Sequence, residues 1–336
     1  MGVALSIIIV NYKSALLIVD CIKSIKQETK NIRYEIIVVD NYSCDNSRDT
    51  IMSHFADVSW IEMNYNAGFA RANNVGIRAA KGEVVLLLNP DTVVLNGAIE
   101  KCYLRFIQSA YVACAVQLLN PDFTPQITGN YFMKGGLNQL LALPYLGSFL
   151  RQIAFAIKVK KTNVQQAGLE EKVDWINGAY LMVKKTAIAA AGLMDEAFFL
   201  YAEETEWCYR LKKTGELCVY GDLSILHLQG ETINKETGTT EKGYSNLFDK
   251  KGLQLIVSNH LRICKQYGSA WFLFNLIMFT IEVPVFAICS FFDHLFHGNN
   301  PFKDVKRIKG FTVNVGKVWR LAPTIIKQKP YFYKML

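Results

Sequence analysis

The N-terminal part of the chain alternates short apolar runs with a segment of helical spacing. Residues 5–10 and 35–39 are continuous runs rich in Ile and Val, as in parallel strands that are buried on both faces. Between them, residues 14–28 repeat apolar side chains at helical spacing, which predicts an amphipathic helix. A second helix is expected to begin after Ser43 and Asp45, because short polar side chains of this kind cap helix N-termini.

This order of elements predicts an α/β fold with a Rossmann-like, mostly parallel sheet and helices on both faces. Another apolar run, residues 84–88, adds a further strand. Ligands of such open sheets bind beyond the carboxyl ends of the strands. The three runs stop at polar clusters, in order Asn11 with Tyr12, Asp40 with Asn41, and Asn89 with Pro90 and Asp91. One such cluster is commonly a turn, but three at successive strand ends favour a shared ligand crevice.

Composition excludes several classes of protein. The chain has 336 residues, of which 51% are hydrophobic, so it can bury a large core, and no repeat or low-complexity tract interrupts it. The eight cysteines contain no C-x-x-C pair, so we expect reduced thiols, with neither a zinc site nor a disulfide framework. No G-x-G-x-x-G follows the first strand, which argues against a nucleotide-binding dehydrogenase.

The net charge of +8 is concentrated towards the C-terminus. Residues 302–336 contain nine Lys or Arg and one Asp, an excess equal to that of the whole chain. A nucleic-acid enzyme would carry its basic surface around the catalytic cleft, whereas a basic tail after an apolar segment is typical of proteins that bind anionic lipid. No nucleic-acid partner is therefore expected.

The C-terminal region is expected to be an apolar and basic helical extension. Residues 271–292 are apolar and long enough to cross a bilayer, but Glu282 lies at their centre beside Pro284. Because a central acid makes insertion marginal, we expect helices in the membrane interface, with the basic tail on anionic headgroups. Residues 137–159 are expected to form a second contact. The alternative is that both segments are buried in a homodimer interface or in the protein's own core.

Five motifs follow one another along residues 6–232: SIIIVNYKS, IIVVDNYSCDNS, NAGFARANNVGI, LLLNPDT and WINGAYLMVKK…GLMDEAFFLYAEETEWCYRLKKTG. In this order and spacing they resemble glycosyltransferase family 2, and within it the bacterial rhamnosyltransferase-type enzymes. The resemblance implies a GT-A fold. A catalytic domain would cover residues 1–235, with a donor half at about 1–120 and an acceptor half at about 121–235, followed by the extension at 236–336.

By this resemblance, the donor pocket combines the strand ends with a loop-to-helix segment. Asp40 would accept hydrogen bonds from the base or the ribose. Gly68 would let the backbone approach the diphosphate at a helix N-terminus, where negative charge is favoured. For Arg71 the alternative is a solvated surface charge. The expected donor-binding residues are Asn11, Tyr12, Asp40, Asn41, Asn66, Gly68, Arg71, Asn73 and Asn89.

The resemblance also implies a divalent cation. Asn89-Pro90-Asp91 takes the place of the family's D-x-D motif, with Asn in the first position. Asp91 is expected to be the principal ligand of Mg²⁺ or Mn²⁺, a hard cation that neutralises charge on the leaving diphosphate. His227, in HLQGET, is expected to be a second metal or phosphate contact; the alternative is a structural histidine.

Inverting transfer requires a carboxylate that accepts the proton of the acceptor hydroxyl. The resemblance assigns this general base to Glu204, where the family usually has Asp, and the preceding aromatic run is expected to raise its pKa. Glu203 and Glu206 are expected nearby, and Glu206 also has the i,i+4 spacing for an ion pair with Arg210. The residues expected beside the donor sugar and acceptor are Trp175, Asn177 and Gly178.

The implied activity is metal-dependent, inverting transfer of rhamnose from dTDP-rhamnose to a hydroxyl of a glycan or polyprenyl-linked precursor. The enzyme would be cytoplasmic and peripheral on the inner face of a bacterial plasma membrane. A UDP-hexose or galactofuranose donor is an alternative. Because Asn89 and Glu204 both replace the family's usual Asp, an inactive nucleotide- or glycan-binding homologue is another. The linkage, the acceptor and the oligomeric state stay open.

Overall fold

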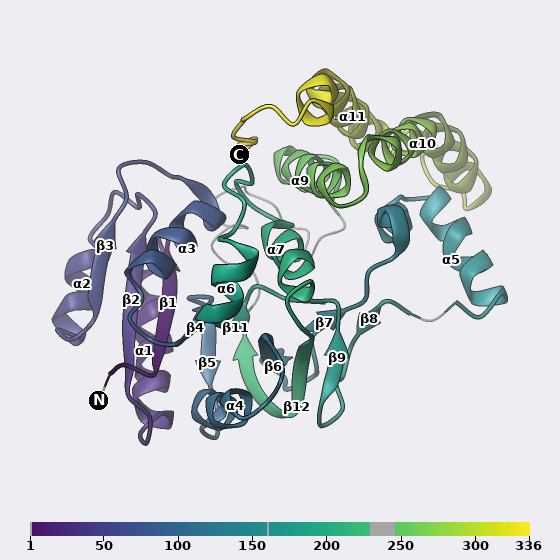
Figure 1. Ribbon diagram of the computed structural model, residues 1–336. Helices are drawn as coiled ribbons and strands as arrows, with labels where there is room; N and C mark the ends of the chain where they lie inside the picture. The colour runs from purple at the N-terminus through teal and green to yellow at the C-terminus, as the bar shows by residue number, and fades with distance from the viewer. Residues whose placement is uncertain (1, 160, 229–245) are drawn as a thin grey trace. The chain divides into compact units, whose positions relative to one another are not determined.

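The computed structural model describes residues 2–159, 161–228 and 246–336 (Figure 1). The chain divides into two compact units. Among the described residues, the first unit contains 2–131, 163–196 and 203–228, and the second contains 132–159, 161–162, 197–202 and 246–336. The expected boundary between residues 235 and 236 lies outside the described residues, and the division into catalytic domain and extension stays a prediction.

The first unit is built on a mixed sheet of nine strands in the order β3-β2-β1-β4-β11-β6-β12-β5, with β9 paired to β12. The strands are β1 (Leu5–Asn11), β2 (Tyr34–Asp40), β3 (Ser59–Glu62), β4 (Val84–Leu88), β5 (Thr92–Val94), β6 (Ala113–Leu119), β9 (Glu171–Val173), β11 (Tyr180–Lys184) and β12 (Leu217–His227). A smaller sheet has the order β10-β7-β8, formed by Trp175–Ile176, Gly129–Asn130 and Asn163–Val164.

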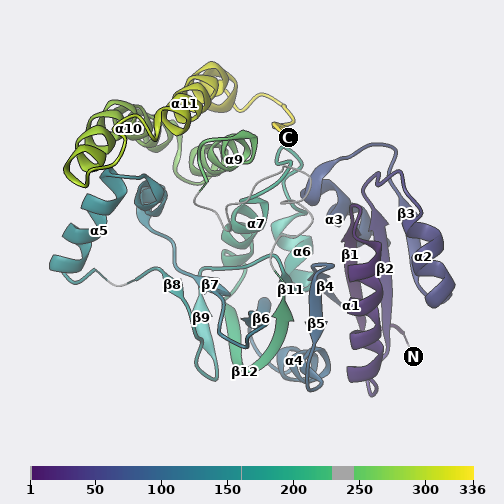
Figure 2. The same cartoon turned by 180° about the vertical axis from the view of Figure 1, so that it is seen from behind.

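The apolar runs form the buried parallel strands that their composition predicts. β3, β2, β1 and β4 are parallel neighbours, and every residue of β1 and β4 is buried. The helices of this unit are α1 (Ala15–Glu28), α2 (Ser47–His54), α3 (Gly68–Ala79), α4 (Ala98–Ile107), α6 (Lys185–Ala191) and α7 (Glu203–Lys212). α1 and α3 cover opposite faces of the sheet (Figures 1 and 2). The predicted GT-A fold class is confirmed.

The two expected caps of α2 are wrong, because its N-cap residue is Asn46. Asp45 Oδ1 accepts a hydrogen bond from Ser47 N, the first residue of the helix, at 2.9 Å. The Ser43 hydroxyl instead donates to Asp40 Oδ1 at 2.6 Å and accepts from Asn11 Nδ2 at 3.0 Å. Ser43 therefore belongs to the polar ends of β1 and β2, because the loop after β2 turns back towards them.

The second unit is helical. It contains η1 (Lys134–Ala142), a 3₁₀ segment kinked at Gly135 and Gly136, together with α5 (Leu146–Ala156), α9 (Lys250–Tyr267), α10 (Ser269–Phe296) and α11 (Val305–Ile326). Its core joins η1, α9, α10 and α11 through buried side chains such as Leu140, Ile263, Phe272 and Phe311. Among the described residues, α10 alone is long and apolar enough to cross a membrane, judged by length and composition.

Candidate active site

The ends of β1 and β2 meet in a buried polar network. Their register places Asn11 beside Asp40, and the two side chains are 0% and 5% exposed. Asp40 accepts three hydrogen bonds, from Asn11 Nδ2 at 2.6 Å, Ser43 Oγ at 2.6 Å and Ser43 N at 3.0 Å. These donors hold the carboxylate at the edge of the sheet where a nucleoside is expected. Tyr12 lies half-buried next to them.

The start of α3 is tied to the end of β2 by side-chain amides. Asn41 Nδ2 donates to Asn66 Oδ1 at 3.0 Å, and Asn41 Oδ1 accepts from Ala67 N at 2.8 Å. Asn66 Oδ1 also accepts from Gly68 N at 3.2 Å, and Gly68 has a positive φ of 77°. The backbone N–H groups of Ala67 and Gly68 therefore already have acceptors. A diphosphate bound at the start of α3 would have to accept hydrogen bonds from N–H groups further along the helix.

Two predicted donor residues on α3 contact the protein itself. Arg71 Nε donates to Glu196 O at 3.0 Å, and its Nη1 donates to Tyr65 Oη at 2.9 Å. Asn73 is 1% exposed, and its Nδ2 donates to Phe69 O at 3.0 Å. Two hydrogen bonds therefore tie Arg71 to the protein itself, and its role in donor binding stays a prediction.

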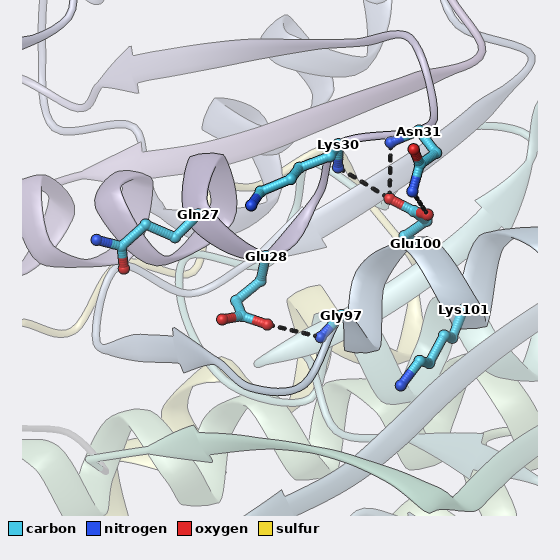
Figure 3. Close-up of a pocket in the computed structure, with 7 residues that line it drawn as sticks. All are labelled: Gln27, Glu28, Lys30, Asn31, Gly97, Glu100 and Lys101. Carbon is cyan, nitrogen blue, oxygen red and sulfur yellow. Dashed lines mark hydrogen bonds between the residues drawn. The ribbon is translucent and has the colours of Figure 1, made fainter.

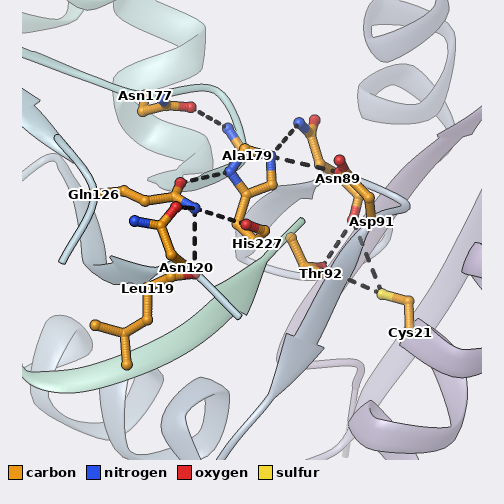
Figure 4. A network of polar contacts seen from close by, with 10 residues as sticks. All are labelled: Cys21, Asn89, Asp91, Thr92, Leu119, Asn120, Gln126, Asn177, Ala179 and His227. Atoms are coloured by element: carbon orange, nitrogen blue, oxygen red, sulfur yellow. Dashed lines mark hydrogen bonds and ion pairs between the residues drawn. The ribbon is translucent and has the colours of Figure 1, made fainter. Parts of the chain in front are cut away.

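His227, the last residue of β12, is oriented by Gln126 (Figure 4). Gln126 Nε2 donates to His227 O at 2.6 Å, Asn120 Oδ1 at 2.9 Å and Leu119 O at 3.3 Å. This leaves Gln126 Oε1 to accept from His227 Nδ1, 2.9 Å away. In the neutral imidazole, Nδ1 therefore carries the proton and Nε2 keeps its lone pair.

The other nitrogen of His227 faces the NPD motif. Nε2 lies 3.5 Å from Asp91 Oδ1 and 3.4 Å from Asn89 Nδ2. The side chains of Asp91 and His227 are 9% and 8% exposed. The backbone also joins the two segments, because Leu228 N donates to Asp91 O at 2.9 Å. The structure thus brings together two predicted metal ligands that are separated by 136 residues in the chain.

Cys21 packs behind the motif and takes no part in its chemistry. Its Sγ lies 3.4 Å from Thr92 Oγ1, which donates to Asn89 O at 2.8 Å (Figure 4). Burial raises the pKa of the Cys21 thiol to about 12, with a hydrogen bond from Thr92 acting against it and Asp91 adding to it. The thiol is therefore neutral at physiological pH, as expected for a structural cysteine.

In the described part of the chain, no group of three or more His, Cys, Asp or Glu side chains is arranged so that it could hold a metal ion. A cation here would have Asp91 and His227 as its protein ligands. Mg²⁺ is commonly held in this way, by one or two side chains with the remaining oxygens supplied by phosphate and water. The residues present therefore fit a cation that binds together with a nucleoside diphosphate.

The acid cluster at the start of α7 contains three acids in different situations. Glu206 forms an ion pair with Arg210, with Oε2 and Nη2 2.8 Å apart, which confirms the expected i,i+4 pair. Glu203 is 3% exposed, and burial, followed by the charge of Glu204, raises its pKa well above 4.5. Glu204 is half-buried as a whole residue, although its Oε2 atom is buried. Its two neighbours are buried as whole residues.

Gly178 connects the acid cluster with the NPD motif. A Cβ at Gly178 would lie 3.5 Å from Glu204 Cβ and Cγ and 3.8 Å from Phe69 Cε1. The next residue, Ala179, accepts a hydrogen bond from Asn89 N at 3.0 Å through its carbonyl oxygen. The turn before β11 therefore lies so close to Glu204 that a side chain at position 178 would contact it, and it is hydrogen-bonded to the NPD motif through Ala179.

The remaining predicted residues lie on this turn or close to it. Asn177 Oδ1 accepts from Ala179 N at 2.9 Å, and Asn177 N donates to Thr128 O at 2.8 Å. Trp175 is half-buried on β10. A surface pocket of about 310 Å³ lies elsewhere, between the end of α1 and the start of α4 (Figure 3). There Glu28 and Glu100 accept from backbone N–H groups of neighbouring loops, which is a structural role.

The sequence did not predict that Gln126 orients His227, or that Ser43 bonds Asp40 and Asn11. Gln126 lies in an irregular segment 101 residues from His227, and no motif marks it. Ser43 could have been found, because it stands within the motif that contains Asp40 and serine hydroxyls commonly bond a carboxylate a few residues away.

The profile of Glycosyl transferase family 2 matches residues 6–162, which include the polar strand ends, the start of α3 and the NPD motif. This part of the chain belongs to glycosyltransferase family 2. The family 2 region ends before Glu204 and His227, so their roles rest on the geometry described above and on the resemblance of their motifs.

Three proteins similar to this chain are named as sugar transferases. A low-salt glycan biosynthesis hexosyltransferase, Agl10 of Haloferax volcanii, is 31% identical over 62% of this chain and 62% of its own length. Rhamnosyltransferase WbbL of Escherichia coli is 24% identical over 54% and 67%. An N-acetylglucosaminyl-diphospho-decaprenol L-rhamnosyltransferase of Mycobacterium tuberculosis is 22% identical over 60% and 68%. The chain thus spans less than two thirds of the Haloferax protein. A crystal structure of S. aureus TarS matches with a TM-score of 0.48 and 11% identity, over 78% of this chain and 40% of that one.

Proposed function

We propose that this chain is an inverting, metal-dependent glycosyltransferase that passes a sugar from a nucleoside diphosphate donor to a hydroxyl acceptor. The observation that carries the proposal is the turn at Gly178 and Ala179, which lies beside Glu204 and is hydrogen-bonded to the NPD motif. Direct displacement needs a base on the acceptor side of the sugar and charge compensation on the leaving-group side. Both kinds of residue occur around this one turn.

Asp91 and His227 would hold the divalent cation, Mg²⁺ or Mn²⁺. The lone pair of His227 Nε2 points to a carboxylate oxygen 3.5 Å away, and two electron-rich atoms in this position favour a cation near both. When bound, the cation would supply charge compensation for the departing nucleoside diphosphate. Gln126 would keep the imidazole in the ligating tautomer, as partners of metal-bound histidines commonly do.

Glu204 would take the acceptor proton. Glu206 is already paired with Arg210, and burial, followed by the charge of Glu204, raises the pKa of Glu203 well above its ordinary value. Glu204 is the remaining acid of the cluster, half-buried and against Gly178. Burial and the charge of Glu204 disfavour the ionised form of Glu203, so Glu204 is the acid of this pair that we assign as the base.

For the donor sugar we propose rhamnose, from dTDP-rhamnose, with a glycan or polyprenyl-linked acceptor. Two of the three relatives named above are rhamnosyltransferases, and one of these is named for a diphospho-decaprenol acceptor. The Haloferax relative is a hexosyltransferase, which favours a UDP-hexose or galactofuranose donor as the second candidate. Asn11, Tyr12, Asp40 and Asn41 would hold the nucleoside, and Trp175 and Asn177 would lie towards the sugar and acceptor.

We also propose that the second unit lies on the inner face of the plasma membrane. α10 turns its polar side chains inward: Asn275 donates to Gly135 O, Glu282 accepts from Tyr145 N and Leu146 N, and Ser290 donates to Asp304 Oδ2. Its outward stripe is apolar and exposed, at Phe274, Ile277, Ile281, Ile288 and Phe292. An apolar outward face is typical of a helix that contacts lipid.

The positive charge on α11 also fits binding to an anionic membrane. Exposed basic side chains recur at helical spacing, at Lys306, Lys309, Lys317 and Arg320. α5 adds exposed apolar side chains, with Phe149 and Phe155 58% and 87% exposed. Hydrophobic area and basic charge together favour an anionic membrane over a second copy of the chain.

The function is tested by measuring transfer and binding with a panel of nucleotide sugars. We expect turnover that requires Mg²⁺ or Mn²⁺, with dTDP-rhamnose the best donor. In calorimetry, Asp91→Ala should weaken nucleoside diphosphate binding in a way that added metal does not restore. Gln126→Leu should weaken it by about 10- to 100-fold, as loss of a partner behind a metal ligand does. Binding without turnover by any donor would instead support an inactive homologue.

The membrane proposal is tested by sedimentation with vesicles. The full chain should bind anionic vesicles at low salt and be partly released at high salt. Ile281→Asp with Ile288→Asp should abolish binding. Leu16→Asp is the matched control, because Leu16 is 75% exposed on α1 in the first unit. The proposal would be contradicted if the full chain failed to bind anionic vesicles. It would also be contradicted if the wild type were a dimer and the double variant a monomer, because the apolar stripe would then be a dimer interface.

A further inference from the structure

The segment that leads into the acid cluster, residues 197–202, belongs to the second unit. Phe198 and Ala202 lie in the core of that unit. Tyr201 and Ala202 both have left-handed backbone conformations, with φ of 68° and 64°. Two successive non-glycine residues in this conformation are uncommon and persist only where their surroundings hold them. Glu203 and Glu204 follow them directly in the chain.

α9 holds one side of this segment. Leu200 O accepts a hydrogen bond from Ser258 Oγ at 2.7 Å, and Ser258 Oγ in turn accepts one from Gln254 Nε2 at 2.9 Å. Gln254 Nε2 also lies 3.5 Å from Leu200 O. Ser258 is 1% exposed and Gln254 is 0% exposed. Because the hydroxyl and the amide are themselves buried, losing the carbonyl as a partner would be costly, and this restricts where Leu200 can lie.

Residues 332–335 hold the other side. Tyr333 N donates to Ala197 O at 3.0 Å, and Tyr333 forms a parallel β-bridge with Phe198. Gln254 joins the two sides, since its Nε2 also donates to Tyr333 O at 3.0 Å and its Oε1 accepts from Met335 N at 2.8 Å. One buried side chain thus links α9, the segment at Leu200 and the segment at Tyr333.

We propose that Gln254 and Ser258 are positioning residues that set the place of Glu204 by clamping the carbonyl of Leu200, four residues before it. This inference rests on the proposed role of Glu204 as the base. Because the intervening Tyr201 and Ala202 hold an uncommon backbone conformation, a shift at Leu200 passes into the first turn of α7. The second unit would therefore govern the transfer step as well as the contact with the membrane.

The test compares Gln254→Leu and Ser258→Ala with the full-length wild type. We expect both to lower kcat, by about 10- to 100-fold for Gln254→Leu, because small misplacements of a reacting group are costly. The Kd of nucleoside diphosphate with Mg²⁺ should not change. Hydrogen exchange at the amides of residues 203–206 should become faster. Ser258→Thr keeps a hydroxyl donor and should restore kcat.

Asn259→Ala is the matched control. Asn259 lies next to Ser258 on α9, and its Nδ2 donates to Leu255 O within the helix at 3.0 Å, away from residues 197–202. It should leave both kcat and exchange unchanged. Unchanged kcat and exchange in folded Gln254→Leu would overturn the clamp, as would an equal loss of kcat in Asn259→Ala. If the wild type binds nucleotide but transfers no sugar, the proposed function fails, while faster exchange in Ser258→Ala would still support the clamp.

Discussion

Two buried glutamates, Glu203 at the start of α7 and Glu282 in the middle of α10, are in opposite situations. They are 3% and 0% exposed. Both carboxylate oxygens of Glu282 accept hydrogen bonds from backbone N–H groups at the start of α5, from Tyr145 at 2.8 Å and Leu146 at 3.0 Å. Glu203 Oε2 has no hydrogen-bond partner within the described ranges. The same residue type is thus satisfied in one region and not in the other.

The two environments act differently on the carboxyl pKa. Burial raises the pKa of both residues. For Glu282 the two backbone N–H groups act in the opposite direction, whereas for Glu203 the charge of Glu204 raises the pKa further. A buried acid therefore has a structural role where hydrogen-bond donors offset the cost of its burial, as at Glu282. A buried acid beside a second acid, as at Glu203, instead indicates a catalytic site.

The largest expected effect is on turnover, and it follows substitution of Glu204. Glu204→Gln keeps the size of the side chain but cannot accept a proton, so kcat should fall by about 10²- to 10⁴-fold while donor affinity survives. Turnover with the best nucleotide sugar and calorimetry with nucleoside diphosphate measure the two quantities. Glu204→Asp restores the family's usual residue in a site built around the longer side chain, and we expect partial activity.

Glu203→Gln is the matched control for that substitution. Burial favours the neutral form of Glu203, and a neutral glutamate resembles a glutamine in shape, so turnover should stay close to that of the wild type. An inactive Glu203→Gln protein together with an active Glu204→Gln protein would reverse the assignment within the cluster. It would leave the fold and the donor site as described.

The next effect in size is on stability, at Glu282. Glu282→Leu leaves two buried backbone N–H groups without an acceptor, which should lower the free energy of unfolding by about 2–4 kcal/mol. Glu282→Gln keeps one acceptor oxygen and should cost less. Denaturant unfolding measures the change, and nucleotide affinity should stay constant in both variants. A wild-type free energy of unfolding for Glu282→Leu would show that the two hydrogen bonds contribute little to the second unit.

The smallest effect is the pH dependence of stability due to Glu203. Its folded pKa lies above the ordinary value of 4.5, so the folded chain binds this proton more tightly than the unfolded chain. The stabilisation is therefore complete below about pH 4.5 and is lost as the pH rises through the folded pKa. One such group gives a slope of at most about 1.4 kcal/mol per pH unit.

Glu203→Gln should remove that slope. The measurement is the free energy of unfolding of wild type and variant from pH 4 to pH 9, where the difference between the two should change with pH. Parallel curves for the two proteins would mean that Glu203 titrates normally in the folded chain, and the contrast with Glu282 would then disappear.

The sequence alone determined the elements whose cause is local. The runs at residues 5–10 and 84–88, apolar except for Ser6, indicated buried strands, because burial on both faces favours apolar side chains along the whole run. The meeting of Asn11 and Asp40 followed from the parallel arrangement of neighbouring strands. The Glu206–Arg210 pair followed from helical spacing.

Only the tertiary structure decided which distant groups became partners. Gln126 orients His227 from 101 residues away, and Glu282 compensates the start of α5 from 136 and 137 residues away. Gln254 reaches both Leu200 and Tyr333. A hydrogen bond across such separations depends on the path of the chain between its ends, and no local pattern of apolar and polar residues encodes that path. For the same reason the sequence indicated a central acid in α10 but not the two N–H groups that compensate it.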